Sequence, residues 1–115
     1  MSAAVAEGDA RAVVRRFVEE VWDAGDPAAL DELTAEGFAL HQLVAGETHD
    51  REGFAEFLES THDAMPDFSM ALRYLVVEGD DAVARLTMSG TPVKPLQAVK
   101  PTGKSFSVDV FQQYR

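Results

Sequence analysis

The first third of the chain has hydrophobic residues at intervals of three and four positions, which is the spacing of one face of a helix. Over residues 9–24 the opposite positions are charged, Asp9 stands where an N-cap side chain is expected, and Gly25 follows as a stop. The sequence therefore predicts an amphipathic helix over 9–24. Its inward residues would be Ala10, Val13, Val14, Phe17, Val18, Val21 and Trp22.

Two more helices are predicted before the pattern changes. Asp26 and Pro27 supply the cap and the first residue of a short helix. Asp50 supplies the cap of a longer one, which ends before a Met-Pro-Asp segment. Between these helices, residues 38–44 predict a short strand and residues 45–50 a turn.

The second half of the chain alternates with a period of two, as strands do. Residues 69–78 and 82–90 are separated by a short Gly-Asp turn and predict a hairpin. Residues 91–104 contain three prolines and predict a loop, and residues 105–115 predict a last strand.

Helices followed by antiparallel strands predict an α+β fold, and 115 residues suffice for one domain spanning 1–115. The segments "ALRYLVV" and "SFSVDVF" are mostly apolar or uncharged on both faces. A sheet with one face in water should instead alternate cleanly. We therefore expect helices on one face of the sheet and a second copy of the chain on the other, giving a homodimer through the sheet.

Charge narrows the range of partners. Twenty acidic residues against ten basic ones give a formal net charge of -10, which argues against binding to nucleic acid or to anionic membranes. An acidic, lysine-poor surface is typical of proteins from salt-rich, halophilic cytoplasm, and ordinary solubility explains it equally well. The lack of cysteine excludes disulfides, and without a membrane-length apolar segment or a secretory leader we expect a cytoplasmic protein.

Polar residues stand at three places where apolar ones are expected, namely Asp109, Arg85 and His41. A carboxylate in a partly dry pocket can act as general acid or base, and an adjacent guanidinium would orient the ligand or bind an anion. By alternation Phe111 shares the face of Asp109, and Thr87 shares that of Arg85, so all four are candidate pocket residues. The alternatives are a buried Asp–Arg pair that only fixes strand register, or an aspartate in solvent.

The remaining candidates carry weaker signals. His41 is either a hydrogen-bonded core residue or a catalyst, whereas His49 and His62 are predicted at the surface. No histidine or carboxylate spacing is typical of a metal site, and there is no glycine-rich phosphate loop, so neither metal nor cofactor is expected. Trp22 and Phe17 are predicted in the core, where aromatic side chains can also line a pocket.

Three segments follow one another along the chain, namely "VVRRFVEEVWDAGDPAALDELTAEGFALHQ", "REGFAEFLESTHDAMPDFSMALRYLVVEGDDAVARLTMSGT" and "PTGKSFSVDVFQ". Taken in this order, they resemble the SnoaL-like polyketide cyclase family, within the nuclear transport factor 2-like group. The resemblance covers residues 12 to 113. It implies a cone-shaped, curved mixed or antiparallel sheet wrapping three N-terminal helices, with a pocket inside the cone and dimers through the outer face of the sheet.

The resemblance also implies a function. In such cyclases an aspartate on a late strand acts as acid and base in an intramolecular aldol ring closure without metal or cofactor, and Asp109 matches that residue. His41 and Arg85 match a histidine and an arginine common in the family. We therefore expect a small apolar or carbonyl-containing ligand in a pocket lined by Asp109, His41, Arg85 and the aromatic residues of the first helix.

Two positions depart from the family pattern. Pro92 stands where a histidine usually assists the aspartate, and Val18 stands where a tyrosine is common. A non-catalytic binder of a small apolar ligand and a dimerisation module with a filled core therefore remain alternatives. Epoxide hydrolysis ranks lower, because it needs a second carboxylate beside the arginine, and Thr87 is the residue two positions after Arg85.

Overall fold

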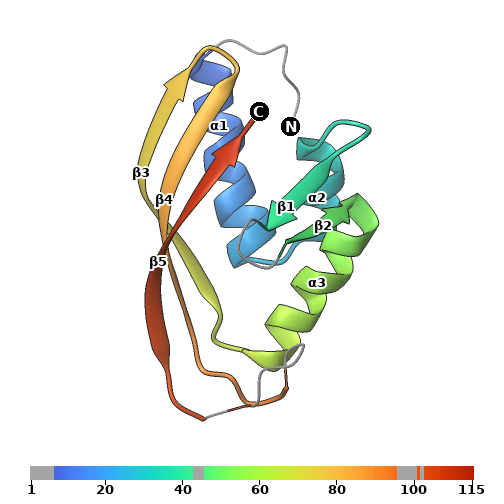
Figure 1. Cartoon of the computed structure of the whole chain (residues 1–115), viewed down its shortest axis with the longest axis vertical. Coiled ribbons are helices and arrows are strands. Elements are labelled where there is room, and N and C mark those ends of the chain that lie inside the picture. The colour runs from blue at the N-terminus through green and yellow to red at the C-terminus, as the bar shows by residue number, and fades with distance from the viewer. Residues whose placement is uncertain (1–6, 43–45, 96–100, 102) are drawn as a thin grey trace.

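The structure is a computed structural model that describes residues 7–42, 46–95, 101 and 103–115. Helices come mainly before strands, and the α+β prediction is confirmed (Figure 1). None of the helices in these ranges is long and apolar enough to cross a membrane. In chain order the elements are α1 (Glu7–Arg16), η1 (Phe17–Asp23), α2 (Pro27–Leu33), β1 (Ala39–Gln42), β2 (Glu47–Asp50), α3 (Arg51–Ala64), β3 (Ser69–Glu78), β4 (Asp81–Gly90) and β5 (Phe106–Tyr114).

The first predicted helix is confirmed, but its second half is wound as a π-helix. α1 passes directly into η1, where the Ala24 N–H donates to the Glu19 carbonyl at 3.1 Å, five residues back. The buried residues of η1 are Phe17, Val18, Val21 and Trp22. These are the apolar positions at the end of the predicted stripe, so the wider helix still turns its hydrophobic face inward.

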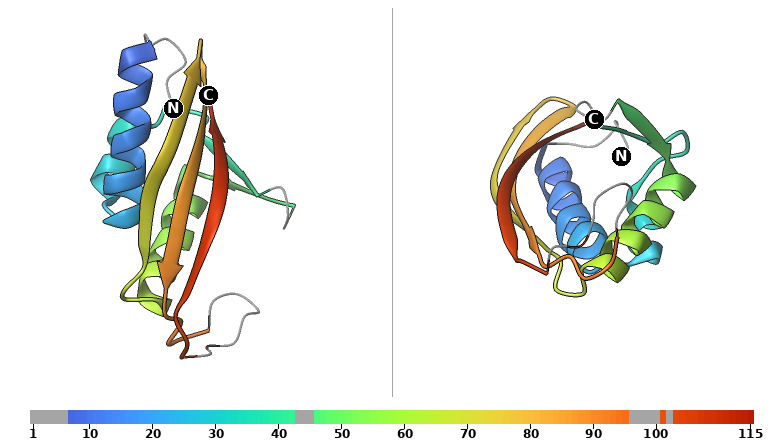
Figure 2. Two further views of the ribbon diagram at one scale, coloured as in Figure 1. Left: turned by 90° about the vertical axis from the view of Figure 1, so that its left-hand side faces the viewer. Right: turned by 60° about the horizontal axis from the view of Figure 1, so that its bottom comes forward.

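Strands β3, β4 and β5 form one antiparallel sheet in that order. The sheet curves around α1 and η1, which pack mainly against β3, while none of the described helices lies in front of its other face (Figure 2). We call the face toward the helices the inner face and the opposite one the outer face. Directly paired residues of neighbouring strands share a face. The inner pairs between β4 and β5 are Ala82–Tyr114, Ala84–Gln112, Leu86–Val110, Met88–Val108 and Gly90–Phe106.

A second, two-stranded sheet was missed in part by the sequence prediction. β1 lies within the predicted strand over 38–44, but the predicted turn over 45–50 is wrong from Glu47 onward, because β2 pairs there with β1. Short polar strands such as "ETHD" lack the apolar alternation that signals a strand. The predicted end of the strand and start of the turn at 43–45 lie outside the described residues.

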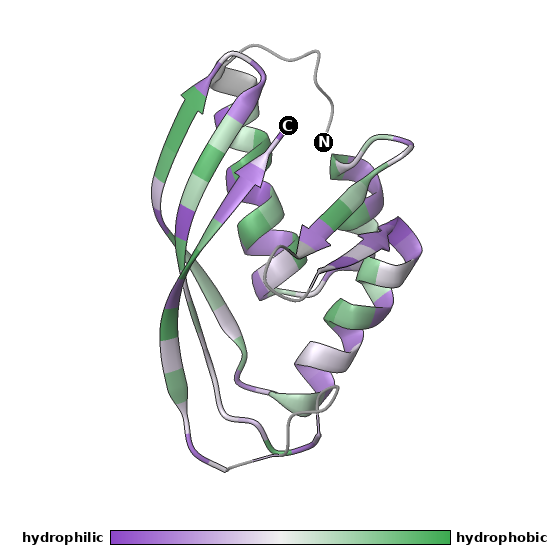
Figure 3. Cartoon of the chain, viewed as in Figure 1, coloured by the Kyte–Doolittle hydropathy of each residue, from purple (hydrophilic) through white to green (hydrophobic). Residues whose placement is uncertain are grey.

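Aromatic rings form the centre of the core. Phe54 of α3 is fully buried, and its ring centroid lies 6.0 Å from Phe17, 5.0 Å from Trp22 and 5.8 Å from Phe38. Figure 3 shows hydrophobic and hydrophilic bands in turn along α1 and α3, as expected for helices with one buried face. The core therefore ties η1, α3 and the segment before β1 together.

Asp67 fixes the start of β3 to the chain that leaves β4. Its carboxylate accepts hydrogen bonds from the Thr91 hydroxyl and backbone N–H, both at 2.7 Å, and these bonds hold the pKa of Asp67 below its usual range. A lowered folded-state pKa adds stability above the unfolded pKa that disappears as pH falls through the folded one.

Replacement of Asp67 should therefore matter most near neutral pH. We expect Asp67→Asn to lower the urea midpoint at pH 6 and to approach the wild-type midpoint at about pH 3, below the ordinary aspartate pKa. Urea unfolding of both proteins across this range measures the effect. A constant difference in midpoint at every pH would show that the carboxylate charge does not contribute.

Candidate functional site

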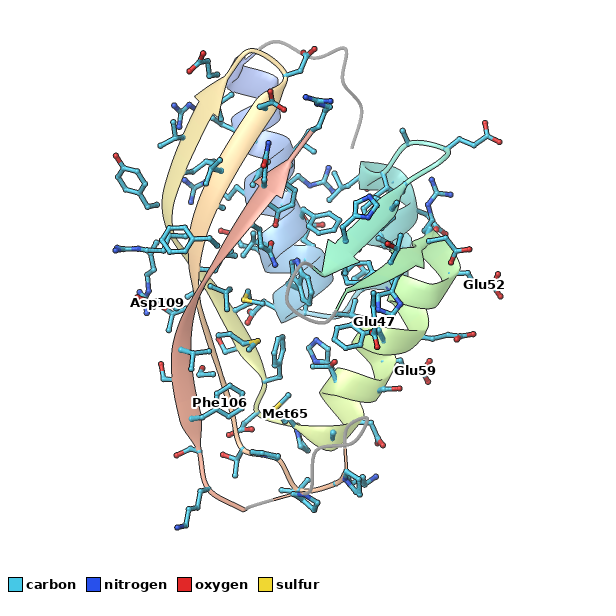
Figure 4. The ribbon with its side chains drawn as sticks, viewed as in Figure 1. Glu47, Glu52, Glu59, Met65, Phe106 and Asp109 are labelled. Atoms are coloured by element: carbon cyan, nitrogen blue, oxygen red, sulfur yellow. The ribbon has the colours of Figure 1, made fainter. Side chains whose placement is uncertain are left out.

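Asp109 does not point into the fold, contrary to the expectation from the family resemblance. It lies exposed on the outer face of β5, paired with Thr87, and its Oδ1 accepts a hydrogen bond from the Thr87 hydroxyl at 3.0 Å. Figure 4 shows Asp109 on the side of β5 away from α3, whereas Phe106 and Met65 lie on the inner side. The carboxylate therefore stands in solvent, one of the alternatives that the sequence left open.

Arg85, Thr87 and Phe111 accompany Asp109 on the outer face. Phe111 shares the face of Asp109 and Thr87 that of Arg85, as alternation predicts, but all four lie on the face that is not covered by helices. Arg85 pairs with Phe111 rather than with Asp109. The guanidinium connected to Asp109 is that of Arg73, whose Nε donates to Thr87 Oγ1 at 3.0 Å, and this hydroxyl in turn donates to Asp109. The outer face thus carries a polar chain between exposed apolar residues.

The histidines are not placed as predicted, because His41 is exposed whereas His49 and His62 are half-buried. His41 is exposed and bonds Thr48 across the hairpin at 3.1 Å, because β1 turns Leu40 and not His41 inward. His49 pairs with Leu40 and lies on the face of the hairpin that α3 covers. Its ring stacks on Phe57 of α3, with 5.6 Å between the ring centroids. The His62 Nε2 lies 2.8 Å from the Trp22 carbonyl oxygen and so joins α3 to η1.

The inner face of the β3–β4–β5 sheet forms an uncharged surface that is only partly covered. Within the described strands its residues are apolar except Gln112 and Tyr114. Val108 is 43% exposed although it faces inward, and its partner Met88 is half-buried. The helices cover β3 more than β5. A hydrophobic surface toward β5 therefore faces α3 and the hairpin without being fully packed.

One end of this surface is polar. Trp22 is 6% exposed, and its Nε1 has no hydrogen-bond partner. The hydroxyl of Tyr114 lies close to the Trp22 side chain without forming a hydrogen bond to Nε1, and it donates to the Gln112 side-chain oxygen. Burial raises the pKa of Tyr114, so the phenol stays neutral and can donate. A buried N–H without a partner is rare and suits a ligand oxygen or a water.

A second unpartnered polar atom lies in the β1–β2 hairpin. Among the described residues, the buried side-chain atoms without a hydrogen bond are Trp22 Nε1 and His49 Nε2. The Glu47 carboxylate lies 3.4 Å from His49 Nε2, near enough for an ion pair with a protonated ring but too far for a good hydrogen bond. Sequence reasoning missed Glu47 and His49 as site residues, although two residues that are two positions apart share a face in any strand.

Two surface hollows lie elsewhere on the molecule. One of about 380 Å³ lies between α2 and α3 and is lined by residues such as Leu30 and Arg51. The other, of about 300 Å³, lies at the β3–β4 turn beside Val76 and Val83. Neither collects the polar groups described above. In the ranges that the structure describes, no three histidine, aspartate or glutamate side chains gather as a metal ion would require.

Comparison with known proteins places the chain in a family. The profile of the SnoaL-like polyketide cyclases matches residues 12–115. The chain belongs to the SnoaL-like polyketide cyclase family. No curated protein matches it significantly. Membership supports a small-molecule protein of the cyclase or isomerase type, and it confirms the resemblance seen in the sequence.

Solved structures show the same fold. TsrD from Streptomyces laurentii is 30% identical with a TM-score of 0.79, over 95% of this chain and 79% of that one. IdmH from Streptomyces antibioticus, a candidate polyketide cyclase, is 25% identical with a TM-score of 0.75, over 90% of this chain and 79% of that one. A candidate SnoaL-like polyketide cyclase from Jannaschia sp. CCS1 is 21% identical with a TM-score of 0.81, over 98% of this chain and 80% of that one, and shows only that the fold is shared.

Proposed function

We propose that this SnoaL-like protein binds a neutral, largely apolar molecule against the inner face of β4 and β5 and acts on it as a cyclase or isomerase. The observation that carries the proposal is the inner surface itself. It is hydrophobic, uncharged and incompletely covered, and at one end it offers the unpartnered N–H of Trp22 beside the Tyr114 hydroxyl. A carbonyl oxygen would satisfy these donors, whereas a carboxylate would lose its hydration without gaining a cation.

Binding is tested with two ligands of equal shape. Trp22 is the only tryptophan, so its indole N–H gives a single ¹H–¹⁵N peak that needs no assignment by mutation. We expect 2-acetylnaphthalene to shift this peak with a dissociation constant of about 0.1–1 mM and to raise the melting temperature. 2-Naphthoate should bind at least about tenfold more weakly, because its charge would be buried unpaired. If neither ligand has any effect, the filled-core alternative is preferred.

Replacement of Asp109 should leave this binding intact. Asp109→Asn keeps an acceptor for the Thr87 hydroxyl on the outer face, so the unfolding free energy should change by no more than about 0.5 kcal/mol. The affinity for 2-acetylnaphthalene, measured by the Trp22 peak, should match that of the wild type. Loss of binding in Asp109→Asn would return Asp109 to the pocket that the family resemblance implied.

The outer face supports a second proposal, that two copies pair through it. Tyr74 and Phe111 are 63% and 72% exposed, and Val76 and Val83 lie on the same face. Arg85 stands between Tyr74 and Phe111 in the strand pairing. An apolar patch mixed with arginine is typical of protein interfaces. A two-fold axis would bring the patch of one chain against the same patch of the second chain.

A further inference from the structure

The proposed reaction needs a group that moves a proton, and the structure leaves few candidates for it. Asp109 faces outward, and the inner face of the described strands carries no charged side chain. Tyr114 stays protonated at neutral pH because burial raises its pKa, so it has no basic oxygen to accept a proton. The Nε2 of His62 is hydrogen-bonded to the Trp22 carbonyl oxygen. The remaining titratable groups on the covered face of the hairpin are His49 and Glu47.

The local structure holds the His49 ring in one place. β2 pairs His49 with Leu40, whose side chain packs on the core, and Phe57 lies against the ring with an interplanar angle of 16°. The Nδ1 edge faces Gly53 in the first turn of α3, where an added Cβ would lie 3.7 Å from Nδ1. The Nε2 edge therefore lies away from the first turn of α3, beside the Glu47 carboxylate.

The electrostatic surroundings of Nε2 suit a base. Nε2 is buried and has no hydrogen bond, so in the tautomer with the proton on Nδ1 its lone pair is free. The Glu47 carboxylate, 3.4 Å away, would stabilise the imidazolium that forms when Nε2 takes a proton. The Glu47 side chain is 47% exposed, so it can move aside for a ligand. Asp50 is committed to the Gly53 N–H as the cap of α3.

We propose that His49, supported by Glu47, is the general base and acid of this protein. The proposal rests on the small-molecule function proposed above. Nε2 removes a proton from the carbon beside a carbonyl, the electron pair of that C–H bond becomes the C=C bond of an enolate, and the carbonyl π electrons pass to oxygen. The imidazolium then returns its proton to another carbon, or to the alkoxide that forms when the enolate carbon attacks a second carbonyl, so no oxidant or cofactor enters the balance.

The test uses 5-nitrobenzisoxazole, a neutral bicyclic probe of carbon-proton removal. A base takes its ring C–H proton, the C–H electron pair becomes part of a nitrile, and the N–O bond breaks to release a coloured cyanonitrophenolate. We expect saturable turnover by the wild type. His49→Ala should reduce the rate by about 100-fold with KM little changed, and added imidazole should restore part of it. A merely structural role for His49 would give no rescue.

The carboxylate is tested separately. Glu47→Gln should reduce the turnover by about tenfold, because the imidazolium loses its partner, whereas Glu52→Gln on the exposed side of α3 should not change it. Figure 4 shows Glu47 and Glu52 at different sites, which makes them a matched pair. A wild type that binds the probe without turnover, or a His49→Ala variant as active as the wild type, would overturn the proposal. Failure of the wild type to bind any neutral probe would instead contradict the proposed function.

Discussion

Phe54→Ala should lower the free energy of unfolding by about 3–5 kcal/mol, a large part of the stability of a domain of this size. Phe54 is fully buried and contacts three other aromatic rings that belong to η1 and to the segment before β1. The cavity left by the missing ring cannot close without moving α3 against η1. Urea unfolding followed by circular dichroism measures the loss.

A second phenylalanine provides the control. Phe111 is 72% exposed on the outer face, so Phe111→Ala removes the same atoms from a site that is largely in water. In the monomer it should change the free energy of unfolding by no more than about 0.5 kcal/mol. Equal losses at both positions would mean that Phe54 is not the centre of the core or that the outer face is covered within one chain.

Phe111→Glu should convert the proposed dimer into a monomer. In a two-fold interface each substitution occurs twice, and a central aromatic residue typically contributes at least about 2 kcal/mol, or about 30-fold in the dissociation constant. The added carboxylate would face Arg85 of its own chain, and the apolar contact that Phe111 offers to the other copy would be lost. Sedimentation velocity over a range of concentrations measures the change.

A control variant separates the effect of an added negative charge from the effect of placing it on the outer face. Ser60→Glu places the same charge on an exposed position of α3, away from the sheet, and should leave the association unchanged. Both variants should keep the far-ultraviolet spectrum of the wild type. A wild type that remains monomeric at about 0.1 mM, or a Phe111→Glu variant that still dimerises, would contradict an interface on the outer face.

The fold was predictable because its signals are local. Caps at Asp26 and Asp50 and the period-two pattern of β3 and β4 place these elements correctly without tertiary information. The π-helical winding of η1 was not predictable, since the same apolar stripe suits both helix types. β2 was missed because "ETHD" has too few apolar residues to indicate a strand.

The candidate site was predicted less well, for a physical reason. Alternation correctly placed Asp109 with Phe111 and Arg85 with Thr87 on one face, but it cannot say which face the helices cover when both are partly apolar. The inner face proved to be the one with Leu86 and Val110. The inward direction of His49 depended on a pairing partner, β1, whose register a sequence does not reveal.

The position of a bound ligand tests the proposed site most directly. Intermolecular nuclear Overhauser effects from the ring protons of 2-acetylnaphthalene would show which methyl groups surround it. An inner-face site beside Trp22 and Tyr114 predicts contacts with Ala84 and Val110 and none with Val83 on the outer face. Contacts with Val83 and Val76, with the inner methyl groups silent, would contradict the proposal and place the ligand beside Asp109 and Arg85 instead.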